Sequence, residues 1–512
     1  MEIEITQQFK KALDIMENTK KHVLITGRAG TGKSTLLEYF RNNTSKRVVV
    51  LASTGVAALN VSGQTIHSFF RFKPSVTLDD VKKIVDEIPN LYTSIDAIII
   101  DEISMVRADL LDCIDRFLRL NTQSSDPFGG KQMILFGDLY QLPPVVTNRE
   151  REALKLMYRT PYFFSANVVK EVDLEVIELD RVFRQKDEEF IEVLDAIRHG
   201  EVDEYVLEKL NSRYIPDFEP PEDEHYIHLT STNKRARQIN EQQLSRLPGE
   251  VYEFPALIEG KFDKESYPTD LNLKLKIGAQ VMLLNNDFHG RWVNGSIGVV
   301  EDIDVHEGVI CVQLENGEVV EVSPFKWTLF EYVYDRENER IGTREIGLFV
   351  QFPLKLAWAI TIHKSQGKTF DKVVIDLSGG IFAPGQLYVA LSRCRTLEGI
   401  VLKQPVEKKH VFVNWKAASF ITQKEYEKAS YKLSVEEKIK LIEKAITEGK
   451  LLEIEYMKSN GKKTKRVVMP MFVGKMNYGD KEYTGLKAHC FKRNEVRNFR
   501  IDRILSMRIV EH

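Results

Sequence analysis

The sequence predicts an α/β protein that contains parallel sheets, an inserted β-rich segment and a small, mainly β C-terminal domain. Between residues 23 and 138, short apolar runs alternate with segments of helical spacing, which is typical of parallel sheets covered on both faces. Residues 270–345 instead show short strands separated by Gly turns. Residues 451–512 carry 14 Lys and Arg against 7 Asp and Glu, whereas the whole chain has a net charge of −3. The 512 residues therefore divide into several structural units.

The parallel-sheet prediction depends on individual apolar runs. A helix is expected over residues 7–19, and another from about Lys33. The buried strands expected in the N-terminal part are Val23–Thr26, Val48–Ser53, Ala97–Asp101 and Met133–Asp138. Apolar runs typical of buried parallel strands recur at Lys355–Thr361 and Lys372–Leu377. We therefore expect the β-rich segment to be an insertion in a second α/β domain.

The cysteine content and the apolar runs limit the class of protein. The four cysteines show no metal-ligand spacing, so zinc is not expected, and scattered thiols fit a reducing cytoplasm. The N-terminal MEIEITQQFKK lacks the apolar core of a signal peptide. No apolar run approaches the ~18 residues of a membrane helix. We therefore expect a cytoplasmic protein with no membrane partner.

A nucleotide-binding motif lies between the first predicted strand and the next helix. Gly27–Ser34 reads GRAGTGKS, which fits G-x-x-x-x-G-K-[ST]. In such a loop, backbone N–H groups surround phosphate oxygens at a helix N-terminus. Lys33 would reach the β- and γ-phosphates of ATP, and the Ser34 hydroxyl would bind Mg²⁺. A chance Gly-rich turn is the alternative. The predicted nucleotide contacts in this segment are Gly27, Ala29, Gly30, Thr31, Gly32, Lys33, Ser34 and Thr35.

Further polar residues follow the predicted strands. Asp101, after a buried strand, would hold Mg²⁺ through water, and Glu102 would polarise the attacking water; a carboxylate pair that caps the next helix is the alternative. Gln141 in GDLYQLPP would contact the γ-phosphate, although this segment alone is only a turn. Hydrolysis also needs positive charge near the γ-phosphate. Arg184 and Arg393 are candidates, and a surface salt bridge is the alternative for each.

Taken in order over about 410 residues, these segments resemble superfamily 1 DNA helicases, and most closely the Pif (petite integration frequency) family of superfamily 1B and its RecD-like relatives. The matching segments are GRAGTGKST, LASTGVAALNVSGQTIHSFF, IIIDEIS, GDLYQLPPV, LDRVFRQKDEEFIEVLDAIRHG, TSTNKRARQIN, KIGAQVMLLNND with NGSIGVV, WAITIHKSQGKTF, and GQLYVALSRCR. The resemblance implies two RecA-like domains with ATP between them and 5′-to-3′ movement. It also implies that Arg184 and Arg393 are arginine fingers.

The resemblance implies further nucleotide contacts and the domain plan. A glutamine before the first strand reads adenine, and both Gln7 and Gln8 qualify, with Gln8 favoured. Gly367 and Lys368 are expected to approach the nucleotide. The implied domains are a RecA-like domain 1A over 1–175 with a wedge insertion at about 71–95, a RecA-like domain 2A over 176–250 and 346–415, an inserted β-barrel-like subdomain 2B over 251–345, a linker over 416–434, and a C-terminal domain over 435–512.

The resemblance also places contacts to single-stranded DNA. Small polar side chains suit phosphate oxygens, which fix register without reading sequence, and sequence-neutral binding adds some base stacking. For Phe69 and Phe70 packing in the core is the favoured alternative, and for His67 stacking and packing stay equally open. The expected DNA contacts are Thr54, Asn60, Thr65, His67, Ser68 and Phe69 in the first half, and Thr361, His363, Lys364, Ser365 and Gln366 in the second.

Residues 435–512 resemble a WYL domain, for which a small five-stranded sheet is expected. The residues that support the resemblance are Tyr456, Arg466, Pro470, Arg497, Arg500, Asp502 and Arg503. The tripeptide that names the domain reads Glu482-Tyr483-Thr484, so only its tyrosine is retained. Arg497 and Arg500 are expected to hold DNA phosphates, since the guanidinium fork suits them. A solvated basic face is the alternative.

The implied function is an ATP-dependent 5′-to-3′ DNA helicase of genome maintenance that translocates on single-stranded DNA. Its expected partners are single strands, forked or tailed duplexes, and replication or repair proteins; G-quadruplexes and RNA–DNA hybrids are further expected substrates. The chain is expected to be monomeric or weakly self-associating and to associate with the nucleoid. The alternatives are a nucleotide-controlled DNA-binding regulator and a RecD-like subunit of a nuclease complex. Gln141, the paired arginines and strand-contact motifs in both halves favour the helicase.

Overall fold

The structure of the chain, a computed structural model, describes residues 5–73, 76–84, 89–221, 224–262, 264–335, 340–478 and 481–510. Contacts divide the chain into two compact units, Met1–Phe412 and Val413–His512. Within the described ranges, no helix combines the length and the apolar character needed to cross a membrane.

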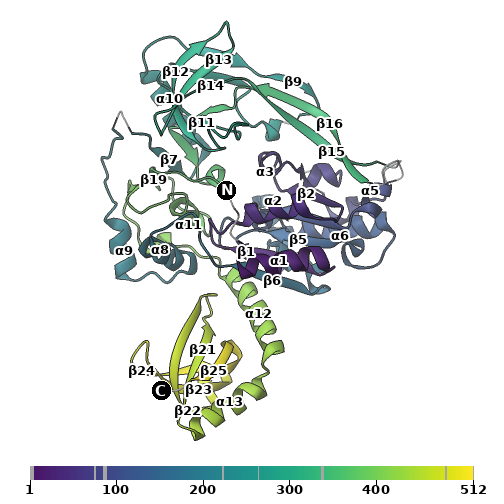
Figure 1. The fold of residues 1–512 in the computed structure, drawn as a ribbon, viewed down its shortest axis with the longest axis vertical. Coiled ribbons are helices and arrows are strands. Elements are labelled where there is room, and N and C mark those ends of the chain that lie inside the picture. The colour runs from purple at the N-terminus through teal and green to yellow at the C-terminus, as the bar shows by residue number, and fades with distance from the viewer. Residues whose placement is uncertain are drawn as a thin grey trace. The chain divides into compact units, whose positions relative to one another are not determined.

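The first part of the N-terminal unit is built on a parallel sheet of six strands in the order β3-β2-β4-β5-β1-β6 (Figure 1). The strands are β1 (His22–Gly27), β2 (Val48–Ala52), β3 (Gln64–Thr65), β4 (Ala97–Asp101), β5 (Gln132–Phe136) and β6 (Leu174–Leu179). The four predicted strands are confirmed as β1, β2, β4 and β5. The sequence did not indicate β3, which has two residues, or β6, which keeps two half-exposed glutamates among its apolar residues.

Helices cover this sheet and complete its core. They are α1 (Gln7–Asn18), α2 (Lys33–Asn43), α3 (Gly55–Asn60), α4 (Ile66–Phe69), α5 (Pro89–Ser94), α6 (Ala108–Thr122) and α7 (Asn148–Met157). The predicted N-terminal helix is confirmed as α1, which begins where the Thr6 hydroxyl accepts a hydrogen bond from the backbone N–H of Phe9. Phe9 and Met16 of α1 and Leu36 of α2 pack against β1, β4 and β5. This packing holds the β1–α2 loop at the carboxyl edge of the sheet.

A second parallel sheet has the order β18-β7-β19-β20. Its strands are β7 (Ile227–Thr230), β18 (Ala359–Thr361), β19 (Val373–Asp376) and β20 (Ile400–Leu402), and the helices nearby in sequence are α8 (Glu188–His199), α9 (Glu204–Asn211), α10 (Asn233–Arg246) and α11 (Gln386–Leu391). The prediction at Lys372–Leu377 is confirmed as β19. The run Lys355–Thr361 is not one strand but two, because its first residues pair with the inserted sheet and its last with β7.

Antiparallel strands form the inserted segment, as predicted. One sheet has the order β14-β13-β12-β11-β17, another β15-β16-β9, and a third pairs β8 with β10. The strands are β8 (Tyr252–Pro255), β9 (Leu257–Gly260), β10 (Asn272–Leu275), β11 (Gln280–Leu283), β12 (Ile297–Asp304), β13 (Val309–Leu314), β14 (Val319–Val322), β15 (Phe325–Asp335), β16 (Arg340–Gln351) and β17 (Leu354–Leu356). Buried Val281 of β11, Val312 of β13 and Leu354 of β17 share one core.

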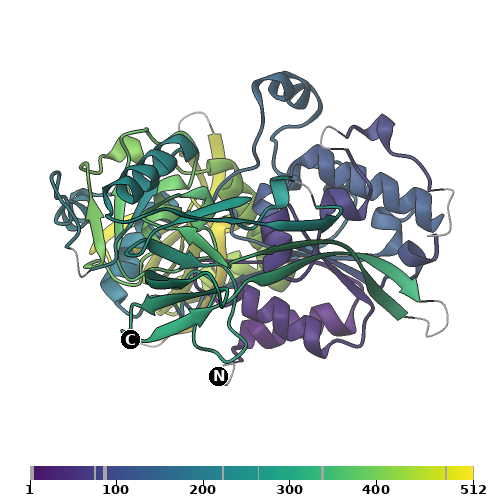
Figure 2. The same ribbon diagram turned by 90° about the horizontal axis from the view of Figure 1, so that it is seen from above.

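The β15–β16 hairpin is long enough to leave the inserted segment and reach the first parallel sheet (Figures 1 and 2). The Tyr332 hydroxyl oxygen accepts from the backbone N–H of Val50 on β2 at 3.1 Å, and the backbone N–H of Tyr332 donates to Oε1 of Gln64 on β3 at 3.3 Å. The hairpin therefore binds the β3 edge of that sheet. The expected wedge, about 71–95, contains α5 and a short 3-10 turn (Leu78–Asp80), while its residues 74–75 and 85–88 lie outside the described ranges.

The C-terminal unit contains two helices and a five-stranded antiparallel sheet in the order β24-β23-β22-β21-β25, which confirms the predicted five-stranded sheet. The elements are α12 (Trp415–Lys432), α13 (Val435–Thr447), β21 (Leu451–Met457), β22 (Lys463–Tyr478), β23 (Lys481–Cys490), β24 (Glu495–Arg500) and β25 (Ile504–Val510).

The segment expected to be a polar linker, 416–434, is mostly the helix α12. Its buried residues are mainly small, such as Ala417, Ala418 and Ala429, so the sequence lacks a clear apolar stripe. The Tyr426 hydroxyl of α12 donates to the carbonyl oxygen of Met457 at the end of β21 at 3.3 Å. This contact attaches α12 to the C-terminal sheet, so the segment is part of that unit.

Candidate active site

The loop after β1 has the backbone that phosphate binding requires. Gly27, Gly30 and Gly32 all have positive φ, and Gly32 is the N-cap of α2. A Cβ atom on Gly30 would lie 2.4 Å from the Cβ of Arg184, so only glycine fits there. Lys33 Nζ donates to the carbonyl oxygens of Gly27 and Arg28, both at 2.9 Å. The ammonium group therefore lies inside the loop, where phosphate oxygens could replace these carbonyls.

Two half-buried carboxylates, Asp101 and Glu102, lie at the end of β4, and the Lys33 ammonium group acts electrostatically on both. The Asp101 carboxylate accepts a hydrogen bond from the backbone N–H of Glu102 at 2.9 Å. Burial and then the neighbouring Asp101 raise the pKa of Glu102 to about 7, although Lys33 acts in the opposite direction. Burial also raises the pKa of Asp101. A carboxyl group with a pKa near neutrality suits a general base at physiological pH.

The loop after β5 holds Gln141 through a buried ion pair. Asp138, fully buried, accepts from Nη2 of Arg198 on α8 at 3.1 Å and from Nε2 of Gln141 at 3.4 Å. The guanidinium of Arg198 also lies over the ring of Tyr140, 4.3 Å from its centroid. Gln366 Nε2 donates to Oε1 of Gln141 at 3.4 Å. The Gln141 amide is thus fixed between α8 and a loop of the second sheet.

The two predicted arginines lie together on the other side of the site. Arg184 Nη1 donates to the carbonyl oxygen of Ser392 at 3.1 Å. Arg393 is buried and donates to the carbonyl oxygen of Val389 and the hydroxyl of Ser392, both at 2.9 Å. Burial, and then Arg184, lower the pKa of Arg393 to about 9. Within the described part of the chain, neither guanidinium group forms an ion pair with a carboxylate, and an anion would stabilise two such adjacent positive charges.

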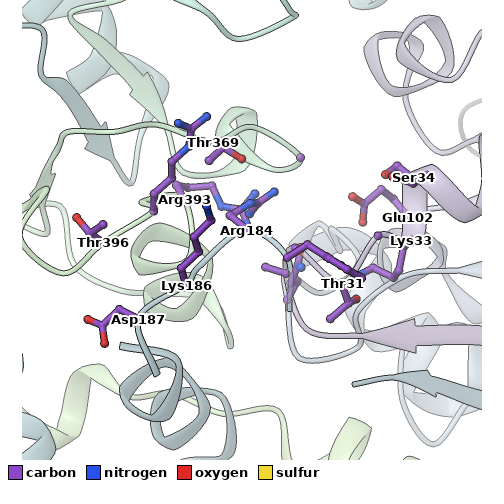
Figure 3. Close-up of a pocket in the computed structure, with 18 of the residues that line it drawn as sticks. Thr31, Lys33, Ser34, Glu102, Arg184, Lys186, Asp187, Thr369, Arg393 and Thr396 are labelled. Carbon is purple, nitrogen blue, oxygen red and sulfur yellow. The ribbon is translucent and has the colours of Figure 1, made fainter. Parts of the chain in front are cut away.

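One cavity of about 1110 Å³ joins these groups. Figure 3 shows Arg184 and Arg393 across the cavity from Lys33, Ser34 and Glu102. Its other lining residues are Phe9, Ala29, Gly30, Thr31, Gly32, Thr35, Gln141, Phe183, Lys186, Asp187, Gly367, Thr369, Arg395 and Thr396. Most of the predicted nucleotide and catalytic residues thus meet at one place, although Lys33 and Arg393 are 360 residues apart in the sequence.

Some predicted nucleotide residues do not line this cavity. Gly27 and Asp101 do not line it, although the Lys33 ammonium group donates to the Gly27 carbonyl oxygen and acts electrostatically on Asp101. Gln8 Nε2 donates to Asp180 Oδ2 at 2.9 Å, and Gln7 is exposed, whereas Phe9 of the same helix lines the cavity. Lys368 differs from the prediction more clearly, because its ammonium group donates to Asn294 at 2.7 Å while Gly367 and Thr369 line the cavity.

In the first segment predicted to contact single-stranded DNA, two threonines lie at the starts of helices. Thr54 and Thr65 are the N-caps of α3 and α4, and the hydroxyl of each accepts a backbone hydrogen bond. Ser68 accepts from Gln64, and Asn60 accepts from Asn294 at 3.0 Å. His67 is half-buried on α4.

Phe69, predicted as a DNA contact, lies in the protein core. It is 3% exposed, and Phe70 beside it is 1% exposed. The Phe69 ring packs edge-on against those of Phe70, Tyr92 and Tyr332. A base cannot stack on a ring that is enclosed in this way, so the favoured alternative of core packing is correct.

The second segment predicted to contact single-stranded DNA is only partly exposed on the surface. Thr361 and Ser365 are buried, and the Ser365 hydroxyl donates to the carbonyl oxygen of Ile362. Because both side chains are buried in this structure, the prediction that they contact DNA is not met. Lys364 is exposed, and His363 stacks against Phe382 with ring centroids 6.5 Å apart.

The two arginines predicted to hold DNA phosphates in the C-terminal unit each form an ion pair. Arg500 pairs with Asp502 at 2.7 Å, and Arg497 pairs with Glu495 at 3.5 Å.

Sequence reasoning missed three residues that organise the site. Asp138 and Arg198 form the buried pair behind Gln141, and the Tyr388 hydroxyl of α11 accepts from the backbone N–H of Ala29 at 3.0 Å. All three lie inside segments that match the family motifs, but none is of a type that reveals its partner. Only the meeting of these segments in the fold identifies them.

The fold and the site define a P-loop nucleotide hydrolase of the motor type. The first parallel sheet supplies the phosphate loop and the carboxylates, whereas Arg184 comes from the loop between β6 and α8 and Arg393 from the turn just after α11. Closing such a cavity around ATP and opening it after hydrolysis would change how the two sheets are arranged.

Comparison with known proteins identifies the family. Residues 2–208 match the sequence profile of the PIF1-like helicases, and residues 437–509 match that of the WYL domain. The ATP-dependent DNA helicase Pif1 of Bdellovibrio bacteriovorus is 35% identical over 416 residues, which are 78% of this chain and 88% of that protein. PIF1 of Danio rerio is 37% identical over 392 residues, which are 74% of this chain and 58% of that protein.

Solved structures agree with these matches. Bacteroides Pif1 in complex with ADP-AlF4 has a TM-score of 0.76 and 39% identity, and the match covers 84% of this chain and 98% of that one. Bacteroides Pif1 bound to single-stranded DNA has a TM-score of 0.61 and 40% identity, with 82% and 96% covered. The chain belongs to the family of PIF1-like DNA helicases and is an ATP-hydrolysing enzyme, with a WYL domain at its C-terminus.

Proposed function

We propose that this helicase moves 5′-to-3′ along single-stranded DNA and unwinds forked or tailed duplexes ahead of it. The observation that carries the proposal is the cavity in which Arg184 and Arg393 lie opposite Lys33 and Glu102. A γ-phosphate bound there would attract charges from the segments of both sheets, and its release would remove that attraction. Each ATP cycle would therefore draw the two sheets together and let them separate, which is the movement that stepping along a strand requires.

The chemistry follows from the positions of the side chains. Lys33 would stabilise the β- and γ-phosphates, and the Ser34 hydroxyl and Asp101 carboxylate have the donor types that would hold Mg²⁺ with them. Glu102 would accept a proton from the attacking water. The two arginines would stabilise the charge that develops on the γ-phosphate. Mg²⁺ would supply further charge neutralisation at the phosphate oxygens.

Gln141 connects this chemistry to the loop that carries Gln366, which is predicted to contact single-stranded DNA. Asp138 fixes its amide nitrogen, and Gln366 donates to its amide oxygen at 3.4 Å. In the proposed cycle, Gln141 turns its oxygen to the attacking water when Gln366 moves toward a bound strand. This arrangement would make hydrolysis depend on single-stranded DNA. A Bacteroides relative of known structure binds such a strand, which supports this choice of partner.

A polarity assay tests the proposal. We expect ATP-dependent unwinding of a duplex with a 5′ single-stranded tail and little unwinding of the same duplex with a 3′ tail. Glu102→Gln serves as the inactive control on both substrates. Preference for the 3′ tail would overturn the direction. Strand-stimulated ATP hydrolysis without unwinding of either substrate would instead favour a nucleotide-controlled DNA-binding protein.

A further inference from the structure

The helix α8 lies between the two parallel sheets in the chain and begins at the nucleotide cavity. It follows β6 of the first sheet and precedes β7 of the second. Its N-cap, Asp187, lines the cavity. In the loop before α8, the backbone N–H of Phe183 donates to the carbonyl oxygen of Gly30 in the phosphate loop at 2.8 Å. The start of α8 is therefore attached to the nucleotide site.

The last turn of α8 carries two buried charged side chains that pair with two different loops of the first sheet. Asp195 Oδ1 lies 3.0 Å from Nη2 of Arg28, which belongs to the phosphate loop. Arg198 Nη2 lies 3.1 Å from Oδ1 of Asp138 in the loop after β5. Side chains three residues apart lie on the same face of a helix. A single turn of α8 therefore contacts both loops.

Packing holds this turn against both loops. His199 Nδ1 lies 3.3 Å from Oδ1 of Asp195, which fixes the carboxylate from the side of the helix. Ala29 of the phosphate loop and Leu142 of the loop after β5 share one hydrophobic core with Ile197 of α8. Close-packed cores transmit displacements and do not deform continuously. A shift of the phosphate loop would therefore reach the loop after β5 through α8.

Nucleotide binding would act on Arg28 directly. Its carbonyl oxygen accepts a hydrogen bond from Lys33 Nζ at 2.9 Å, and phosphate oxygens would draw that ammonium group away. Its side chain is held by Asp195, so a change in the phosphate loop would be passed to α8. On the other side of α8, Asp138 accepts from Nε2 of Gln141 at 3.4 Å. The ion pairs of one helical turn thus join the phosphate loop to Gln141.

We propose that Asp195 is a positioning residue for ATP hydrolysis. By holding Arg28, it makes the phosphate loop, α8 and the loop of Gln141 move together when nucleotide binds. This coupling rests on the proposed role of Gln141 in orienting the attacking water, and it adds a second control on that residue. Gln141 would then respond to phosphates in the loop as well as to a DNA strand.

Steady-state ATP hydrolysis with saturating oligo-dT tests the coupling. Asp195→Asn and Arg28→Gln should each lower kcat by about tenfold, a typical coupling between two sites, while the affinity for a fluorescent ADP analogue stays close to that of the wild type. Arg28→Lys, which keeps the charge, should retain most of the turnover. Arg47→Gln removes a surface ion pair with Asp96, which has a distance of 2.9 Å, and is the matched control with unchanged kcat.

Double-mutant cycles separate positioning from a purely structural role. If Asp195 acts through Gln141, Asp195→Asn should have little further effect on kcat in a Gln141→Ala background. Likewise, Arg28→Gln should have little further effect when Asp195→Asn is already present. Effects of independent substitutions would instead multiply. Circular dichroism melting shows whether each variant is folded, and Arg28→Gln, whose side chain is partly exposed, tests the same pair if Asp195→Asn does not fold.

The outcomes distinguish the coupling from the proposed function. Wild-type turnover in Gln141→Ala would overturn the proposed role of Gln141 and the coupling with it. A lower kcat in Gln141→Ala, combined with wild-type kcat in Asp195→Asn or with effects that multiply, would overturn the coupling alone. Weaker ADP binding with unchanged kcat would assign the pair of Arg28 and Asp195 to nucleotide binding only, which would also overturn the coupling.

Discussion

Glu102 combines several unusual properties at the scale of a single residue. Its backbone is in the left-handed region, with φ 50° and ψ 46°, which is uncommon for a residue with a side chain. Burial, together with the neighbouring Asp101, raises the pKa of its carboxyl to about 7. Strained backbone and perturbed ionisation cluster at functional sites. Both properties therefore favour Glu102, rather than Asp101, as the base.

The first prediction concerns this base. Glu102→Gln should lower ATP turnover by at least ~10²-fold while ATP binding persists, because only proton transfer is removed. In the wild type, kcat/KM for ATP should fall as pH decreases below about 7, since the base then becomes protonated. Steady-state ATPase assays from pH 5.5 to 9 measure both effects. Glu152→Gln, an exposed glutamate on α7, is the control. Full turnover in Glu102→Gln would show that another group is the base.

The second prediction separates the arginines that line the cavity. Arg184→Ala and Arg393→Ala should each lower turnover by ~10³-fold or more, because both guanidinium groups would stabilise the transferred phosphoryl group and neither is ion-paired to a carboxylate among the residues that the structure describes. Arg395→Ala should cost less than tenfold, since Arg395 pairs with Asp371 at 3.1 Å on the surface. Single-turnover hydrolysis and nucleotide binding distinguish lost chemistry from lost affinity. A loss below threefold would make that arginine structural.

At the scale of elements, the β15–β16 hairpin joins parts of the chain that lie far apart in sequence. Its Tyr332 contacts β2 and β3 of the first sheet, about 280 residues earlier. The Tyr332 oxygen is the acceptor for the backbone N–H of Val50, which is 1% exposed. A buried donor that loses its acceptor is unfavourable by about 1–3 kcal/mol. The hairpin is thus held to the first sheet by a polar contact as well as by ring packing.

Tyr332→Phe tests this attachment with little change in shape. The variant should lower the free energy of opening at Val50 by about 1–3 kcal/mol, because the backbone N–H is left without its acceptor. Hydrogen exchange read by mass spectrometry should show faster exchange in peptides that cover β2 and the hairpin. Tyr334→Phe, two residues away on the same strand, is the control. Unchanged exchange over β2 would mean that the hydrogen bond does not hold the hairpin.

At the scale of the whole molecule, the chain separates into a unit with all the nucleotide groups and a smaller basic unit. The boundary lies at Phe412–Val413, and α12 belongs with the C-terminal sheet. Residues 451–512 carry a net charge of +7. Because the ATPase groups and the basic WYL domain belong to different units of one chain, we expect a division of labour, in which the first unit performs the chemistry and the second adds contacts to a polyanion.

Truncation tests this division. A chain ending at Phe412 keeps both parallel sheets, so it should fold and hydrolyse ATP, but it should bind single strands more weakly and with a shallower salt slope. Titration of fluorescent oligonucleotides at several salt concentrations compares it with the intact protein. A chain ending at Glu427 cuts α12 and should be less stable than the shorter one. Equal affinities and slopes for the intact and 1–412 proteins would show that the C-terminal unit does not contact DNA.

The parts of this protein that could be predicted from the sequence are those with a local signal. The run from β1 through Gly27–Ser34 into α2, and the apolar strands β2, β4 and β5, are each specified by neighbouring residues. Glu102, Gln141 and the two arginines follow from motifs in a fixed order, and all of them line the cavity. Local backbone preference and local apolar runs are sufficient for such elements, because they need no distant partner to be recognised.

Only the tertiary structure decided which distant groups meet. It placed Phe69 in the core, where the ring cannot contact single-stranded DNA. It also divided Lys355–Thr361 between two sheets and paired Arg198 with Asp138. In addition, it made a helix of the expected linker and brought Lys368 to Asn294 of the inserted segment. Burial and long-range pairing depend on the whole fold, and the same phenylalanine, lysine or alanine is compatible with either environment until its neighbours are in place.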